Sequence, residues 1–284
     1  MCTFSTWENQ ETFFCPKAFK HEDIRAYLWY YLRERKKQTS YRKVHILENS
    51  KQVKSKKRVA DHGEVFTSER EVKAMCDLVA DECLRIDSRF LEPACGDGNF
   101  LAEILKRKLS AVRSKYGKSA YDYERNSILA LTSLYGVDIL ADNAQICRER
   151  LYRLWDDSYS SECKRECNDE TRAAARFILG VNIVCGNALS MMCVDEHQQD
   201  AEQFITFPEW TFPFNDARIK RRDFRLDVLL KENPDEDCYD NQFNLFSNDA
   251  MSVDNWMIDS MTNELVPKPV REYPLVHYRR LANG

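Results

Sequence analysis

From about Gly63 onward, short runs of apolar residues typical of strands alternate with longer stretches whose apolar residues have helical spacing. Ser68 and Glu71 have the spacing of a capping box, and the apolar residues after them recur at the steps of a helix face. Short apolar runs that are bounded by glycine or polar residues indicate strands. Helices are therefore expected at 68–83, 98–112, 121–132, 144–154 and 170–179, and strands at 89–92, 134–138 and 182–185.

The order of these elements predicts the fold class. A strand, a glycine-rich turn, a helix, a strand ending in an acid, a helix and a third strand describe a parallel sheet with crossover helices, which is an α/β fold. Such sheets bind ligands beyond the carboxyl ends of their strands, where Glu92, Asp138 and Asn187 fall. The outer edge of the third strand is expected to be exposed and to need a partner that covers it.

Less regular segments flank this region. Residues 27–32 are rich in aromatic side chains and indicate a helix, and a basic run follows from Arg33 to Arg58. This run is either a solvated surface or an arm that lies along phosphates. Farther along the chain, residues 204–207 are expected to form a strand. The chain is thus divided into an N-terminal helical and basic appendage (1–60), an α/β domain (61–230), and an acidic loop with a C-terminal tail (231–284).

Composition narrows the setting but not the function. Of the 284 residues 43% are hydrophobic, which is enough for a sizeable core, and the net charge of −4 does not by itself indicate a nucleic-acid partner. The 11 cysteines, the lack of a signal peptide at the start and the lack of a long apolar run favour a reducing cytoplasm and no membrane contact. Cys163 and Cys167 have no second ligand pair, so no metal site is expected.

The strongest chemical signal is a glycine-rich loop between the first strand and its helix. Gly96 and Gly98 allow the backbone to pass close to a ligand, and the helix that follows presents free N–H groups. A dinucleotide-binding loop would carry a third glycine where Leu101 stands, so that assignment fits poorly. The acid before the loop, Glu92, suits a cationic ligand end better than a pyrophosphate. The full segment reads Glu92-Pro93-Ala94-Cys95-Gly96-Asp97-Gly98-Asn99-Phe100-Leu101.

This segment resembles the cofactor motif of adenine-N6 DNA methyltransferases, especially the modification subunits of restriction–modification systems. Three further segments resemble motifs of the same families in the same order: Gly63–Ser68 upstream, Tyr135–Ile139 at the second strand and Cys185–Leu189 at the third. Val65 and Ser68 depart from the family pattern, which has an aromatic residue and a proline there. The resemblance covers about residues 60–190 and implies a Rossmann-like sheet that binds S-adenosylmethionine.

The resemblance also implies roles for individual residues. Asp138 would accept hydrogen bonds from the ribose hydroxyls, Ile139 would pack on the adenine, and Asn187 would lie near the adenine edge. Thr67 and Glu92 would reach the amino-acid end of the cofactor. For Cys95 a packing role is expected, because no base stands near it in the sequence. The full set of expected cofactor-binding residues is Phe66, Thr67, Glu92, Pro93, Ala94, Cys95, Gly96, Asp97, Gly98, Phe100, Leu101, Asp138, Ile139, Asn187 and Ala188.

One part of the family pattern is missing. The family holds the target adenine with Asn/Asp-Pro-Pro-Tyr/Phe after the fourth strand, and the nearest string here, Asn233-Pro234-Asp235-Glu236, lacks the second proline and the aromatic residue. The catalytic residues therefore stay unknown. The chain is expected to be the cofactor-binding part of a split DNA methyltransferase, with an incomplete sheet and a second methyltransferase chain, DNA and a restriction nuclease as partners. The alternatives are a non-catalytic regulatory subunit that binds cofactor or DNA, a methyltransferase that acts on RNA or protein, and an enzyme in which an unfamiliar segment of this chain holds the base.

A compact basic cluster follows the expected sheet. Arg218, Lys220, Arg221 and Arg222 are either DNA-phosphate contacts or the exposed start of a surface helix. The aromatic residues before the cluster, Trp210, Phe212 and Phe214, would suit a flipped base, but aromatic residues at this density are more often part of a core.

Overall fold

Three parallel strands form the centre of the computed structural model, which describes residues 58, 64, 67–214, 216–230, 255–258 and 265–283. These strands are β1 (Phe90–Glu92), β2 (Leu134–Asp138) and β3 (Ile183–Asn187). Glu92 pairs with Gly136 of β2, and Gly136 pairs in turn with Ile183 of β3. The predicted parallel sheet of an α/β fold is therefore confirmed, and its strand order is β1-β2-β3.

The helices between these strands begin and end close to where the apolar spacing predicts, except that the helix expected over 144–154 is longer and spans Ala141–Cys163. The capping box is present, because the Ser68 side chain accepts from the Glu71 N–H and the Glu71 carboxylate accepts from the Ser68 N–H. The expected single helix over 68–83 is interrupted at Val79, which has φ −121° and ψ 35°. The helices are α3 (Glu69–Leu78), α4 (Ala80–Leu84), α5 (Asn99–Tyr116), α6 (Ala120–Thr132), α7 (Ala141–Cys163), α8 (Asp169–Asn182) and α9 (Leu226–Leu229), with 3-10 turns η2 (Lys164–Glu166) and η4 (Tyr278–Asn283).

The outer edge of β3 is covered, so the expectation of an exposed edge there is wrong. β4 (Met192–Val194) pairs antiparallel with β3, and β5 (Asp200–Phe204) pairs antiparallel with β4. The expected strand over 204–207 is divided at Ile205. The Ile205 N–H donates to the Met191 carbonyl and its own carbonyl accepts from Leu226, so this residue belongs to neither neighbouring ladder.

A second sheet is built from the later part of the chain. Its central strand β7 (Arg218–Arg225) pairs antiparallel with β6 (Thr206–Thr211), with β10 (Arg271–Glu272) and with β11 (Val276–His277). Residues beyond the expected domain limit at 230 therefore contribute strands to the same sheet as the basic cluster. A short hairpin of β8 (Trp256–Ile258) and β9 (Leu265–Pro267) is also present.

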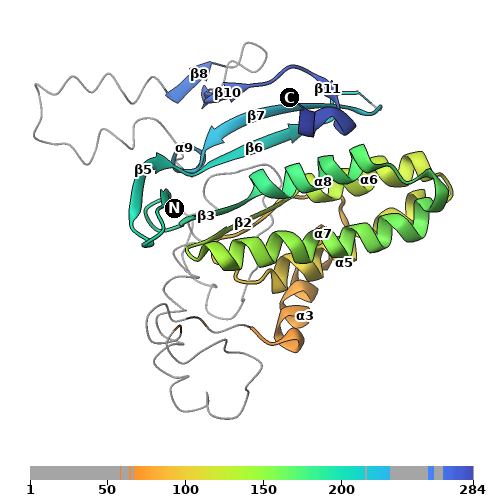
Figure 1. Ribbon diagram of the computed structural model, residues 1–284, viewed down its shortest axis with the longest axis horizontal. Coiled ribbons are helices and arrows are strands. Elements are labelled where there is room, and N and C mark those ends of the chain that lie inside the picture. The colour runs from red at the N-terminus through yellow and green to blue at the C-terminus, as the bar shows by residue number, and fades with distance from the viewer. Residues whose placement is uncertain are drawn as a thin grey trace, which may run out of the picture.

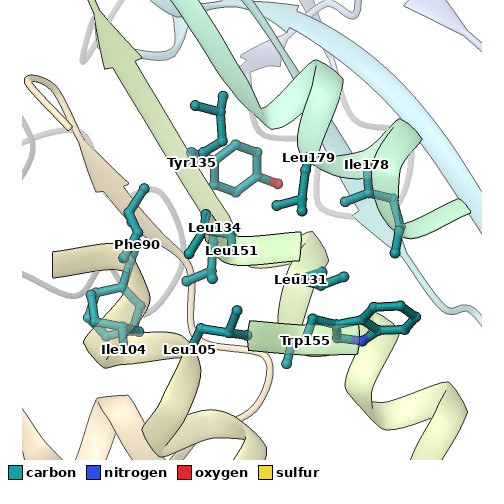
Figure 2. Packing of buried hydrophobic residues seen from close by; sticks show 14 of the residues in the cluster. Phe90, Ile104, Leu105, Leu131, Leu134, Tyr135, Leu151, Trp155, Ile178 and Leu179 are labelled. Atoms are coloured by element: carbon teal, nitrogen blue, oxygen red, sulfur yellow. The ribbon is translucent and has the colours of Figure 1, made fainter. Parts of the chain in front are cut away.

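The two faces of the parallel sheet are covered differently. Figure 2 shows Leu134 with Leu151 and Leu105 on the side of α5 and α7, whereas Tyr135 of the same strand points away from them. The Tyr135 ring meets Phe207 of β6 edge-on at 5.4 Å, and its hydroxyl donates to the Pro208 carbonyl at 2.8 Å. The second sheet, with β6 and β7 in Figure 1, thus packs on the face opposite α5 and α7.

Two of the buried charged side chains, Lys108 and Glu124, tie separate parts of this framework together. Lys108 of α5 is fully buried, and its ammonium donates to the carbonyls of Arg85, Ile86 and Ser88 at 2.7, 3.1 and 2.6 Å. These bonds tie the loop before β1 to the helix after it. Because a buried cation is costly unless it is hydrogen-bonded, the three carbonyls explain why lysine is tolerated there.

Glu124 of α6 is the second buried charge, with 2% of its surface exposed. Its carboxylate accepts from the Tyr159 hydroxyl at 2.6 Å, from the Tyr278 hydroxyl at 2.5 Å and from the Arg279 Nε at 2.8 Å. These contacts join α6 and α7 to η4. They hold the last described turn of the chain against the helical layer.

Within the described part of the chain, no helix has both the length and the apolar character that crossing a membrane requires.

Candidate functional site

The loop between β1 and α5 depends on two glycines with left-handed backbone. Gly96 has φ 54° and Gly98 has φ 85°, which residues with a side chain rarely adopt. The Cys95 N–H donates to the Val137 carbonyl of β2 at 2.9 Å, and the Gly98 N–H donates back to the Cys95 carbonyl at 2.8 Å. The loop is therefore wound tightly across the carboxyl ends of β1 and β2.

Close packing also fixes this loop against its neighbours. A Cβ at Gly98 would lie 2.7 Å from the Sγ of Cys147 in α7, and one at Gly136 would lie 3.1 Å from the Cβ and Sγ of Cys95. Cys95 and Cys147 are themselves buried. The expected packing role of Cys95 agrees with this position, since burial and a hydrogen bond to Cys147 keep the pKa of its thiol raised.

Asp138 lies at the centre of the site. Its Oδ2 accepts from the Gly96 N–H at 2.8 Å, and its Oδ1 accepts from the Leu140 N–H at 2.9 Å and the Asn143 Nδ2 at 3.2 Å. The pKa of Asp138 is raised by burial, while these three hydrogen bonds act in the opposite direction. The carboxylate that the sequence singles out is thus bonded directly to the glycine loop.

A pair of residues before α3 closes one side of the site, and sequence analysis missed it. Arg58 donates through Nε and Nη2 to the Glu64 carboxylate at 2.7 and 2.8 Å, and through Nη1 and Nη2 to Asp142 at 2.6 and 3.1 Å. Asn143 bridges Glu64 to Asp138 through its Nδ2, at 2.8 and 3.2 Å. No sequence signal separates Arg58 from the other basic residues before it.

The remaining residues expected from the loop are placed in two ways. Glu92 ends β1 and is 4% exposed, and Asp97 forms an ion pair with Arg150 of α7 at 3.4 Å. Phe100 and Leu101 begin α5 with their side chains in the core rather than at the surface. Pro93 is buried, Ala94 and Thr67 are half-buried, and Phe66 lies outside the described residues.

The side chain of Asn187, at the end of β3, forms its hydrogen bonds with residues outside the glycine loop. Its Nδ2 donates to Asp200 of β5 at 2.9 Å, and its Oδ1 accepts from the Leu189 N–H at 3.0 Å. Ile139 and Ala188 are half-buried near the ends of β2 and β3. The structure therefore brings Gly96 and Asp138 into direct contact but turns the Asn187 amide toward the β4–β5 hairpin.

Negative charge predominates around Asp138. In the described residues, Arg58 and Arg150 are the cations that pair with the acids of this site. The carboxylates of Asp138 and Glu92 contribute to the raised pKa of the Cys95 thiol, so both acids lie beside the loop. The acids that gather here are Glu64, Glu92, Asp97, Asp138 and Asp142. An arrangement of this kind favours a cationic ligand over a phosphate.

The predicted DNA-binding cluster lies on β7 and not at the start of a helix. Arg218 pairs with Asp216 at 2.7 Å, Lys220 with Glu272 at 3.1 Å and Arg221 with Asp223 at 2.7 Å. Arg222 pairs with Glu209 of β6. Each cation of the cluster therefore has an acidic partner, which lowers the positive potential available to a phosphate backbone.

The described residues contain no group of three or more His, Cys, Asp or Glu side chains placed to hold a metal ion. Comparison of the chain with protein-family models, with curated proteins and with solved structures gave no match.

Proposed function

We propose that the chain binds S-adenosylmethionine and is the cofactor-binding part of an adenine-N6 DNA methyltransferase of the restriction–modification type. The observation that carries the proposal is the hydrogen bond from the Gly96 N–H to the buried Asp138 carboxylate, at 2.8 Å. It joins the two segments whose sequences most resemble the family's cofactor motifs. It also lies beyond the carboxyl ends of parallel strands, where α/β sheets bind their ligands.

The residues present fit this cofactor. Asp138 already accepts three hydrogen bonds, and a carboxylate offers about four acceptor sites, so it has capacity left for a ribose hydroxyl. Gly96, with φ 54°, has no side chain that could block the close approach of a ligand to the loop. The surplus of carboxylates suits the sulfonium and ammonium charges of the cofactor. When bound, the cofactor supplies an electrophilic methyl group.

The place where a partner would join is the free side of β1. Among the described strands β1 pairs with β2 alone, whereas β3 is covered by β4. An unpaired strand edge presents free backbone N–H and C=O groups to a further strand. In open α/β sheets the ligand crevice forms where a strand joins on the opposite side of the first one. We infer that a second chain carrying Asn/Asp-Pro-Pro-Tyr/Phe adds its strand there, beside Glu92 and the glycine loop.

The first test is calorimetric titration of the chain with S-adenosylmethionine. Asp138→Ala removes an acceptor that is charged and buried, so binding should weaken by about 1.5–3 kcal/mol, or roughly tenfold to more than a hundredfold. Asp87→Ala is the matched control, because Asp87 is exposed and lies before β1, away from the loop. No binding by the unsubstituted chain, or equal losses in the two variants, would refute the cofactor site.

The second test addresses activity. Methyl transfer to mixed-sequence DNA should be very slow with this chain alone, because its sequence lacks the Asn/Asp-Pro-Pro-Tyr/Phe motif with which the family holds a flipped adenine. Addition of a partner chain with the base-binding motif should restore it. Robust transfer by the single chain would contradict the split arrangement. Cofactor binding without transfer in either condition would favour the regulatory alternative.

A further inference from the structure

Two buried hydrogen-bond donors on α7 have no partner among the described residues, and they lie one helical turn apart. They are the Nε of Arg148 and the hydroxyl of Tyr152. Residues four apart share one face of a helix. Because buried polar groups are nearly always satisfied, two such donors on one face indicate an acceptor that binds between them.

A second arginine reaches the same place from α8, which runs beside α7 in Figure 1. The guanidinium of Arg176 lies 3.9 Å from the centre of the Tyr152 ring. Within the described part of the chain, neither Arg148 nor Arg176 forms an ion pair. Arg172, one turn before Arg176, shows the contrast, because it is held by Asp156 at 2.8 Å and by Asp169 at 3.0 Å.

The surface beside Arg176 has room for a ligand. Gly180 lies one turn after Arg176 on α8, and a Cβ added there would meet no atom within 4 Å. Burial and the Asp138 carboxylate raise the pKa of Cys185 on β3, and the positive charge of Arg148 lowers it. Arg148 therefore lies near β3. Arg148 lies about 10 Å along α7 from Ala141, the first residue of that helix, and α7 begins shortly after Asp138 in the chain.

We propose that Arg148, Tyr152 and Arg176 form a phosphate-binding site on the surface between α7 and α8. Two guanidinium groups and a hydroxyl supply donors only, and the planar forks of arginine match the oxygens of a phosphate. The site is formed by residues of α7 and α8. Its assignment to a DNA backbone phosphate rests on the proposed function, whereas the phosphate chemistry itself does not.

The proposed site differs from the predicted basic cluster on β7 in whether its cations are already paired with acids of the protein. The cations of that cluster are already paired with acids of the protein. Arg148 and Arg176 instead form no ion pair within the described residues, so counterions bound to a phosphate can be released when they contact it.

Substitution at Gly180 gives the sharpest test, because it leaves the site residues in place. Gly180→Glu adds a carboxylate one turn from Arg176, and Gly180→Gln adds a side chain of the same shape without charge. Both replacements favour the helix and meet no atom, so folding should be preserved. Titration with inorganic phosphate should show binding to the unsubstituted chain and to Gly180→Gln, and at least about tenfold weaker binding to Gly180→Glu.

The arginines and the hydroxyl are then tested directly. Arg148→Gln with Arg176→Gln should abolish measurable phosphate binding, and Tyr152→Phe should weaken it about tenfold without loss of thermal stability, since the hydroxyl is unsatisfied. Arg113→Gln with Arg153→Gln removes the same charge from exposed ion pairs elsewhere and should leave phosphate binding unchanged. Absence of phosphate binding, or equal losses in the control, would overturn the site.

Binding of short duplex DNA over a range of salt distinguishes the source of the phosphate. If the ligand is a backbone phosphate, the Arg148→Gln/Arg176→Gln variant should reduce the salt slope by about 1, the contribution of one phosphate contact. An unchanged slope together with lost binding of inorganic phosphate would overturn the DNA assignment and assign the site to a small anion. Calorimetry with S-adenosylmethionine on the same samples separates this result from a failure of the proposed function.

Discussion

Replacement of Gly98 by alanine places a methyl group where the glycine loop and α7 already touch. The new Cβ would lie 2.7 Å from the Sγ of Cys147, about 1 Å inside an ordinary carbon–sulfur contact. The backbone at this position also has φ 85°, which an alanine adopts only with strain. Two separable effects therefore oppose the substitution.

The size of each effect follows from its origin. The left-handed conformation costs alanine about 1–2 kcal/mol, and overpacking in a closed core costs about 1–3 kcal/mol. Gly98→Ala should therefore lower the free energy of unfolding by about 2–5 kcal/mol. When Cys147 is also replaced by alanine, the closest remaining side-chain atom is its Cβ at 3.4 Å, so only the conformational part should persist.

A double-mutant cycle measured by urea unfolding tests this reasoning. The free energies of unfolding of Gly98→Ala, Cys147→Ala and the double variant should show a coupling energy of about 1–3 kcal/mol, in the direction of mutual compensation. A coupling energy near zero would show that the contact with Cys147 is not what excludes a side chain at Gly98. Equal stability of Gly98→Ala and the unsubstituted chain would refute both effects.

Two further predictions concern buried groups. Lys108→Met should lower the free energy of unfolding by about 3 kcal/mol, because three carbonyls lose their donor. The control Lys106→Met, at an exposed position on the same helix, should change it by less than about 0.5 kcal/mol. Equal effects of the two substitutions would contradict the role of the three bonds. Burial raises the pKa of Cys163 to about 12, so the unreactive thiol predominates at pH 8.5. Mass spectrometry should therefore find Cys163 unmodified by iodoacetamide in the native chain but modified in urea. Equally fast modification in both states would contradict its burial.

The parallel part of the fold was predictable because its signals are local. The apolar spacing, the glycine turn and the capping box at Ser68 each act over a few neighbouring residues, and β1, β2 and β3 lie where they indicate. The position of Asp138 near the glycine loop was also predictable, because the carboxyl ends of adjacent parallel strands meet at one edge, but the hydrogen bond between Gly96 and Asp138 was not predicted.

The second sheet was not predictable in the same way. β7 carries charged residues that normally mark an exposed surface, but Arg221 stacks on Tyr273 at 4.4 Å and pairs with Asp223, so both are largely covered. Its strand partners β10 and β11 lie far along the chain, and no periodicity announces such pairs. The contacts of Arg58 depend in the same way on tertiary neighbours, because Asp142 lies 84 positions away.

The Glu124 network has a consequence for the order in which the chain can acquire its structure. Glu124 is separated from Tyr278 by 154 positions, and from Arg279 by 155. During synthesis, the helices that surround this carboxylate, and the Tyr159 hydroxyl that binds it, emerge long before its other two donors, Tyr278 and Arg279. A buried carboxylate without its donors is strongly destabilising, so the helical layer cannot close fully around Glu124 until residues 278 and 279 have left the ribosome. Completion of this part of the core therefore follows the synthesis of residues 278 and 279, by which point the strands that pair with β7 have also been made.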